Sequence, residues 1–268
     1  MHLVLFVALM AAQTVFVPIT AEERYVADLR ARIARGDVEA EVALGNLYEA
    51  GSILPQDPAQ AIEWYRRAAD KGHAGAEANL AMMYLDGDGV PRDVRVAIDW
   101  YEKAASHGDV IASFSLGSIY EAGADGVRQD EGKAATWYRR AAEQGLGTAQ
   151  YRLGLLYRDG RGLTRDEGQA ISWLRRAADL GEAEAQIELG IMLSPGRGPS
   201  ADIVEAHTWF NLAASRWTNE ARRVQAARLR DELEAAMTAD QRAQAFHRAA
   251  DWQDTHAWQR QSAASKQP

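Results

Sequence analysis

Apolar and polar positions between residues 39 and 220 follow the spacing of amphipathic helices. Four apolar residues of one segment lie at i, i+3, i+4 and i+7, which is one face of an α-helix. They are Ala61, Trp64, Tyr65 and Ala68. The preceding segment carries Leu44, Leu47 and Tyr48 at the same kind of spacing. The pattern therefore predicts two short helices that pack together.

This pair of helices recurs five times. A tryptophan marks the second helix of each copy at intervals of 36 or 37 residues: Trp64, Trp100, Trp137, Trp173 and Trp209. A leucine marks each first helix: Leu44, Leu80, Leu116, Leu153 and Leu189. Self-similarity at such a period is typical of a solenoid, in which each repeat contacts only its neighbours.

The segments between the two helices of each copy carry the signals of helix ends. Glycine-rich turns such as Gly160-Arg161-Gly162 come first, and glycine readily adopts the left-handed conformation that ends a helix. An aspartate follows in every copy: Asp57, Asp93, Asp130, Asp166 and Asp202. An aspartate at this point accepts hydrogen bonds from the free N–H groups of the next helix. Both signals predict a helix-turn-helix unit.

We therefore predict an all-α fold, a right-handed α/α superhelix of about five 36-residue helix-turn-helix repeats with terminal capping helices, forming one solenoid over residues 22–258. The predicted repeats are 39–74, 75–110, 111–147, 148–183 and 184–219. A helix over 22–36 caps the first repeat. Helices over 219–258 cap the last, and the final helix starts at the capping box Thr238–Gln241. The polar tail 259–268 is expected to be disordered.

The tryptophans invite a ligand-binding interpretation, such as stacking on a sugar. Their constant place among alanines at helical spacing instead favours a structural role, in which they pack in the core between adjacent helix pairs. On that interpretation, Trp137→Ala is expected to lower the free energy of unfolding by about 3–5 kcal/mol.

The repeated residues carry a family resemblance. Residues 75–110 read GAEANLAMMYLDGDGVPRDVRVAIDWYEKAASHGDV, and the string LG..Y..G.G...D...A..W...AA..G runs through the copies. This string resembles the Sel-one-like repeat, a relative of the tetratricopeptide repeat, over about residues 39–220. The resemblance implies an α-solenoid that acts as an adaptor between proteins.

A second face of the first helices varies among the copies. By resemblance to tetratricopeptide repeats, this face lines a concave groove that binds a protein or an extended peptide. Its candidate residues are Asn46, Met82, Phe114, Ser118, Glu121, Tyr151, Leu155 and Arg158. The alternative is that curvature partly buries the face and its side chains only pack.

The amino terminus differs from the repeats. Residues 3–17 are almost all apolar, and the first charged side chain is Glu22. We interpret residues 1–21 as a secretory signal peptide cleaved near Ala21, so that the mature chain is periplasmic or secreted. A short membrane anchor, a misassigned start and a buried helix are the alternatives. Only a retained anchor would bring the protein to a membrane.

Composition narrows the functional classes. The net charge of −8 and the pI of about 5.3 argue against nucleic acid as the main partner. The chain has no cysteine, which excludes disulfides and thiolate metal sites, and its six histidines form no zinc motif. We expect no metal, no cofactor and no catalytic residues.

The sequence thus favours a non-enzymatic scaffold that binds a protein or peptide partner in the bacterial periplasm or envelope. One alternative is an immunity or inhibitor protein that neutralises an effector. Another is a hydrolase acting on cell-wall or β-lactam-like substrates, to which cysteine-rich relatives have been linked. Their disulfide framework is absent here.

Overall fold

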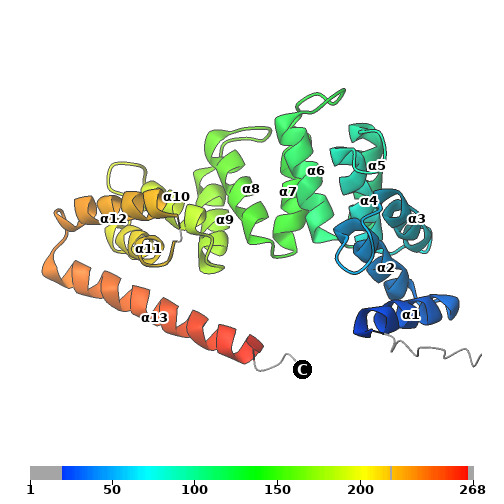
Figure 1. Cartoon of the computed structure of the whole chain (residues 1–268). Coiled ribbons are helices and arrows are strands. Elements are labelled where there is room, and N and C mark those ends of the chain that lie inside the picture. Colours follow the sequence, from blue (N-terminus) through cyan, green and yellow to red (C-terminus); the bar gives the residue numbers. More distant parts are fainter. Residues whose placement is uncertain (1–19, 218, 265–268) are drawn as a thin grey trace, which may run out of the picture.

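The computed structural model describes residues 20–217 and 219–264, which form thirteen α-helices and no strand (Figure 1). The helices are α1 (Ala21–Ala34), α2 (Val38–Ala50), α3 (Pro58–Ala69), α4 (Ala74–Asp86), α5 (Val94–Ser106), α6 (Val110–Ala122), α7 (Glu131–Glu143), α8 (Gly147–Asp159), α9 (Glu167–Asp179), α10 (Ala183–Leu193), α11 (Ile203–Arg216), α12 (Glu220–Glu234) and α13 (Ala239–Ala264). The predicted all-α solenoid is confirmed.

The five repeats are the helix pairs from α2–α3 to α10–α11, which follow one another in chain order (Figure 1). Among the described helices, extensive packing joins helices that are consecutive in the chain. The exception is α11, which also packs against α13, two helices further along. This nearest-neighbour arrangement is what stacked repeats produce. All five predicted aspartates cap second helices. For example, Asp57 Oδ1 accepts from the Gln60 N–H at 3.0 Å, and Asp166 Oδ1 from the Gln169 N–H at 2.9 Å.

The centre of each repeat is the residue that follows the tryptophan. These five side chains are at most 5% exposed: Tyr65, Tyr101, Tyr138, Leu174 and Phe210. Four of them lie against a glycine of the first helix: Gly45, Gly117, Gly154 and Gly190. A Cβ added to Gly117 would lie 2.6 Å from Cδ1 of Tyr138, closer than real contacts allow. Glycine there lets the two helices approach closely around the aromatic ring.

The tryptophans reach the core to different degrees, and Trp100 and Trp137 pack against it without being buried. Trp173 and Trp209 are buried, but Trp64, Trp100 and Trp137 are only half-buried at the edge of the core. Consecutive residues lie roughly 100° apart around a helix, so the residue after each tryptophan points between the helices and the tryptophan does not. A cation three residues later covers the ring in four copies, as Arg67 does over Trp64 at 4.4 Å.

Each first helix also buries one polar residue at the same register: Glu41, Glu77, Ser113, Gln150 and Gln186. The Glu41 carboxylate pairs with Lys71 at 2.8 Å and with Arg67 at 3.0 Å. In the fourth repeat, Gln150 Nε2 donates to the Ala142 carbonyl at 3.1 Å, which satisfies a carbonyl near the end of the preceding helix. In four of the five repeats this position makes polar contacts beyond its own helix, whereas Ser113 donates to the Asp109 carbonyl at the start of its own helix.

The terminal helices cover both ends of the array. Helix α1 starts at a capping box in which Thr20 and Glu23 exchange hydrogen bonds. At the other end, Thr238 and Gln241 exchange hydrogen bonds before α13. Helix α13 continues to Ala264, which lies within the tail that begins at residue 259. Residues 259–264 include glutamine, arginine and alanine, which favour helix. Residues 265–268 lie outside the described residues.

Helix α13 runs back along the second helices of the last repeats (Figure 1). The Trp252 ring meets the Trp209 ring edge-on at 6.4 Å between centroids. His256 Nε2 lies 2.6 Å from the Asp179 carbonyl oxygen, at the end of α9. Helix α11 also contributes His207, whose ring meets the Phe246 ring of α13 edge-on at 5.3 Å between centroids. His207 is fully buried, and its ring nitrogens have no hydrogen-bond partner among the described residues.

We expect His207 to make folding stability depend on pH. Burial lowers the pKa of this imidazole below 6.5, and Arg230 of α12 acts in the same direction, while Glu234 and Asp231 oppose it. Above pH of about 6.5, both folded and unfolded states are neutral. As the pH falls below that value, the unfolded chain binds a proton at His207 and the folded chain does not. The free energy of unfolding therefore decreases by about 1.4 kcal/mol for each pH unit, until the pH reaches the pKa of the folded state.

Urea unfolding at pH 7 and pH 5 measures this effect. His207→Leu should reduce the loss of stability on acidification. The control is His247→Leu, because His247 lies exposed on α13 beside Asp251. An equal acid-induced loss in the wild type and His207→Leu would contradict the assignment.

Candidate functional site

The candidate residues of the first helices share one face, which we call the first-helix face: Asn46, Met82, Phe114, Ser118, Glu121, Tyr151, Leu155 and Arg158. Asn46 and Met82 are exposed, Met82 at 40%, and the other six are half-buried. Helix α13 packs against α11 and reaches the end of α9, both of which are second helices. The first-helix face is therefore not the surface to which α13 is bound.

Most polar residues of the first-helix face already have partners within the protein. The Tyr65 hydroxyl donates to Asn46 Oδ1 at 2.7 Å. The Tyr138 hydroxyl donates to Glu121 Oε2 at 2.7 Å and lies 3.2 Å from Ser118 Oγ. Burial, followed by the interaction with Glu49, raises the pKa of Tyr65, and burial is also the main cause of the raised pKa of Tyr138. Both hydroxyls stay protonated and fix these polar groups in place.

The apolar members of the face divide into two kinds. The Phe114 ring packs on Tyr138 at 5.4 Å between centroids, so it belongs in part to the core of its repeat. Tyr151 and Leu155 border the core of the last repeats and stay half-exposed. Burial raises the pKa of Tyr151. Met82, Tyr151 and Leu155 are the residues that offer apolar surface to a partner.

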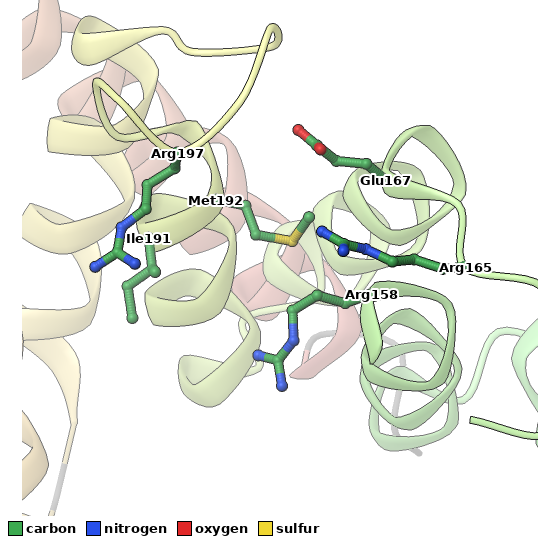
Figure 2. Close-up of a pocket in the computed structure, with 6 residues that line it drawn as sticks. All are labelled: Arg158, Arg165, Glu167, Ile191, Met192 and Arg197. Carbon is green, nitrogen blue, oxygen red and sulfur yellow. The ribbon is translucent and has the colours of Figure 1, made fainter. Parts of the chain in front are cut away.

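A pocket of about 210 Å³ lies where the fourth and fifth repeats meet (Figure 2). Its lining comes from the end of α8, the start of α9, and α10 with the turn that follows it: Arg158, Arg165, Glu167, Ile191, Met192 and Arg197. Of these, only Arg158 is among the residues predicted for the first-helix face. Arg165, Glu167 and Arg197 come from turns or helix starts, where side-chain direction does not follow from helical spacing.

The three arginines of the pocket differ in their partners. Arg158 Nη1 donates to Glu188 Oε2 at 2.5 Å, and its Nε donates to Asp159 at 2.7 Å. The hydrogen bond to Asp159 is the main cause of the raised pKa of Arg158. Within the described part of the chain, the guanidinium groups of Arg165 and Arg197 pair with no carboxylate. The pocket therefore contains unused donors for an anion.

The described residues form neither a metal site nor a membrane-spanning helix. Among residues 20–217 and 219–264, no group of three histidine, aspartate or glutamate side chains is placed so that it can hold a metal ion. In the same ranges, no helix combines the length and apolar character that crossing a bilayer requires.

Comparison with known proteins identifies the repeats. The Sel1 repeat profile matches residues 38–73, 74–109, 110–146, 147–182 and 183–216. Each match begins one residue before the boundary predicted from the tryptophan spacing. Proteins with this repeat are protein-interaction scaffolds and are generally non-enzymatic. The comparison with curated proteins gave no match.

Solved structures agree with the profile. The crystal structure of a protective antigen of uropathogenic Escherichia coli, which displays an SLR fold, is 32% identical with a TM-score of 0.71. The match covers 91% of this chain and 52% of the antigen, so this chain spans about half the antigen's length. A Sel1 repeat protein of Oxalobacter formigenes is 30% identical over 75% of this chain and 83% of its own, with a TM-score of 0.68.

A more distant likeness concerns an immunity protein of Pseudomonas aeruginosa. It is 21% identical over 81% of this chain and 76% of its own, with a TM-score of 0.42, which supports no argument about function. The profile matches and the two relatives of at least 30% identity are decisive for the family. This chain belongs to the Sel1 repeat family.

Proposed function

We propose that this protein is a non-enzymatic scaffold that binds a protein or peptide partner through the first-helix face. One observation carries the proposal: Met82, at 40% exposure, and the half-exposed Tyr151 and Leu155 give this face apolar surface, while α13 is bound to the second helices. Partly exposed aromatic and apolar side chains on a rigid helical surface are the usual anchors of protein interfaces.

Site-specific photo-crosslinking in the native host tests the proposal. A benzophenone amino acid at position 82 is expected to give a defined adduct with a partner protein. The matched control places the same amino acid at Glu102, which is exposed on the second helix α5. Adducts from position 102 alone would place the working surface on the second helices and overturn the proposal.

We further propose that the chain is exported, with residues 1–21 as a signal peptide cleaved near Ala21. Residues 1–19 lie outside the described residues, so the support is the apolar run itself. Cleavage near Ala21 would also affect the capping box at the start of α1. A cut after Ala21 removes Thr20, whose side chain accepts the Glu23 N–H at 3.1 Å, and would lower the stability of α1 by about 1 kcal/mol.

Amino-terminal sequencing of the protein from its own host measures the position of the cut. Export predicts a mature chain that begins at or near Glu22. Recovery of Met1 on a soluble cytoplasmic protein would contradict export. Recovery of Met1 in a membrane fraction would identify the segment as a retained anchor.

A further inference from the structure

The repeats provide an internal comparison for the arginine pocket. In the junction between the third and fourth repeats, Arg161 in the turn after α8 reaches back to two glutamates. Its Nε donates to Glu131 Oε1 at 2.8 Å, and its Nη1 donates to Glu121 Oε1 at 3.2 Å. An arginine at this turn position is thus neutralised by glutamate side chains of the preceding repeat.

One repeat later, the same register holds a different set of charges. Arg197 occupies the place of Arg161, and Glu167 occupies the place of Glu131. The place of Glu121 is taken by Arg158, so one of the two carboxylates is replaced by a guanidinium group. Arg197 therefore lacks a counterpart to one of the two carboxylates that pair with Arg161.

Other charges near the pocket do not restore the missing carboxylate. Arg158 is held by Glu188 and Asp159, which leaves their carboxylates engaged. Glu167 Oε1 is shielded from solvent and accepts no hydrogen bond from the described residues. Arg165 adds another guanidinium group, which projects toward Met192 in Figure 2. Arg165 and Arg197 are therefore the two guanidinium groups of the lining that have no carboxylate at ion-pair distance among the described residues.

We propose that this pocket binds a glutamate side chain of the partner, and that its carboxylate pairs with Arg165 and Arg197, whose guanidinium groups stand apart in Figure 2 and, being exposed, rotate toward it. The guanidinium groups supply charge-assisted hydrogen bonds. Ile191 and Met192 supply an apolar wall for the methylene groups of the glutamate. The choice of glutamate follows the preceding junction, where Glu121 and Glu131 fill the equivalent place. The inference rests on the proposed function, because Arg158 joins the pocket to the first-helix face.

Glu167 is the internal competitor for this site. Its repeat equivalent Glu131 pairs with Arg161, so a rotation of the Glu167 side chain toward Arg197 would neutralise that arginine. Removal of the Glu167 charge by Glu167→Gln therefore strengthens binding of an external carboxylate. Substitution of Arg165 or Arg197 by glutamine weakens it. These opposite effects separate a carboxylate site from general damage to the fold.

The test titrates N-acetyl-glutamate N-methylamide into the full chain and follows the arginine Nε–H signals by NMR. We expect Arg165 and Arg197 to shift with a dissociation constant in the millimolar range, since one carboxylate supplies the affinity. The glutamine analogue should cause no such shift. Arg161 in the same spectrum is the internal control, because its donors already contact glutamates.

Variants sharpen the test. Arg197→Gln and Arg165→Gln should each weaken binding at least fivefold, and Glu167→Gln should strengthen it about threefold. Arg128→Gln is the matched control, since Arg128 lies exposed in another turn and its substitution changes the net charge equally. Equal shifts with the glutamine analogue, or equal shifts at Arg161, would overturn the inference. Saturation by inorganic phosphate without binding of the glutamate probe would also overturn it.

The two proposals fail in distinguishable ways. Adducts from position 82 without any shift of Arg165 and Arg197 would keep the scaffold function and remove the glutamate pocket. Specific shifts of these arginines without adducts from the first-helix face would keep the pocket and remove the proposed function.

Discussion

Tyr138→Ala is expected to lower the free energy of unfolding by about 3–5 kcal/mol, the range for loss of a buried aromatic side chain. Tyr138 is 1% exposed and lies in the middle repeat. Its ring fills the space above Gly117 and contacts Phe114, and its hydroxyl donates to Glu121. The substitution leaves a cavity and removes one of the two donors to the half-buried Glu121 carboxylate, the other being Arg161. Urea unfolding followed by circular dichroism measures the change.

Trp137→Ala is the matched comparison. The Trp137 ring is half-buried, and Arg140 lies over it at 5.7 Å, so we expect its loss to lower the free energy of unfolding by about 1–2 kcal/mol. This is smaller than the effect predicted for a buried tryptophan. Because repeats contact only their neighbours, weakening the middle repeat should also split unfolding into two stages. A larger effect for Trp137→Ala than for Tyr138→Ala would contradict the structure, in which Tyr138 is the more buried of the two side chains.

Loss of apolar side chains from the first-helix face is expected to weaken partner binding. Tyr151→Ala should reduce the affinity by about 2 kcal/mol, or roughly thirtyfold, as for an aromatic interface anchor. Met82→Ala should reduce it less, because methionine has a smaller and more flexible side chain. The measurement is binding of the partner recovered by crosslinking from position 82, with purified proteins.

The control is Val224→Ala on α12, because Val224 is also apolar and is 56% exposed, but it lies outside the first-helix face. It should bind the partner as the wild type does. Circular dichroism of each variant checks that helix content is unchanged. Full affinity in Tyr151→Ala and Met82→Ala, with weaker binding in Val224→Ala, would assign the interface to the C-terminal helices.

The polar residues of the first-helix face are poor positions for substitutions that test partner binding. Asn46, Ser118 and Glu121 each lie within hydrogen-bond distance of a tyrosine hydroxyl of their own repeat. Substituting them would disturb the core as well as any interface. Sequence spacing placed them on one helical face but could not reveal these partners. The partner tyrosines lie 17–20 residues away, on the second helix.

The helices themselves depend on local interactions, and these can be read along the chain. Apolar spacing, aspartate caps and glycine turns act within a few residues of each other. The five repeats and their order therefore followed from sequence, as did the start of α13 at Thr238. The end of α13 did not, because no strong helix-breaking residue marks it before Pro268.

By itself, the sequence determined an all-α solenoid of five repeats, because the same local signals recur in every copy. Only the tertiary structure decided which residue of each Trp-Tyr, Trp-Leu or Trp-Phe pair is central, since this depends on the rotation of one helix against another. It also decided that Arg165 and Arg197 share a pocket with Arg158. These side chains come from separate turns and are brought together by the stacking of one repeat on the next.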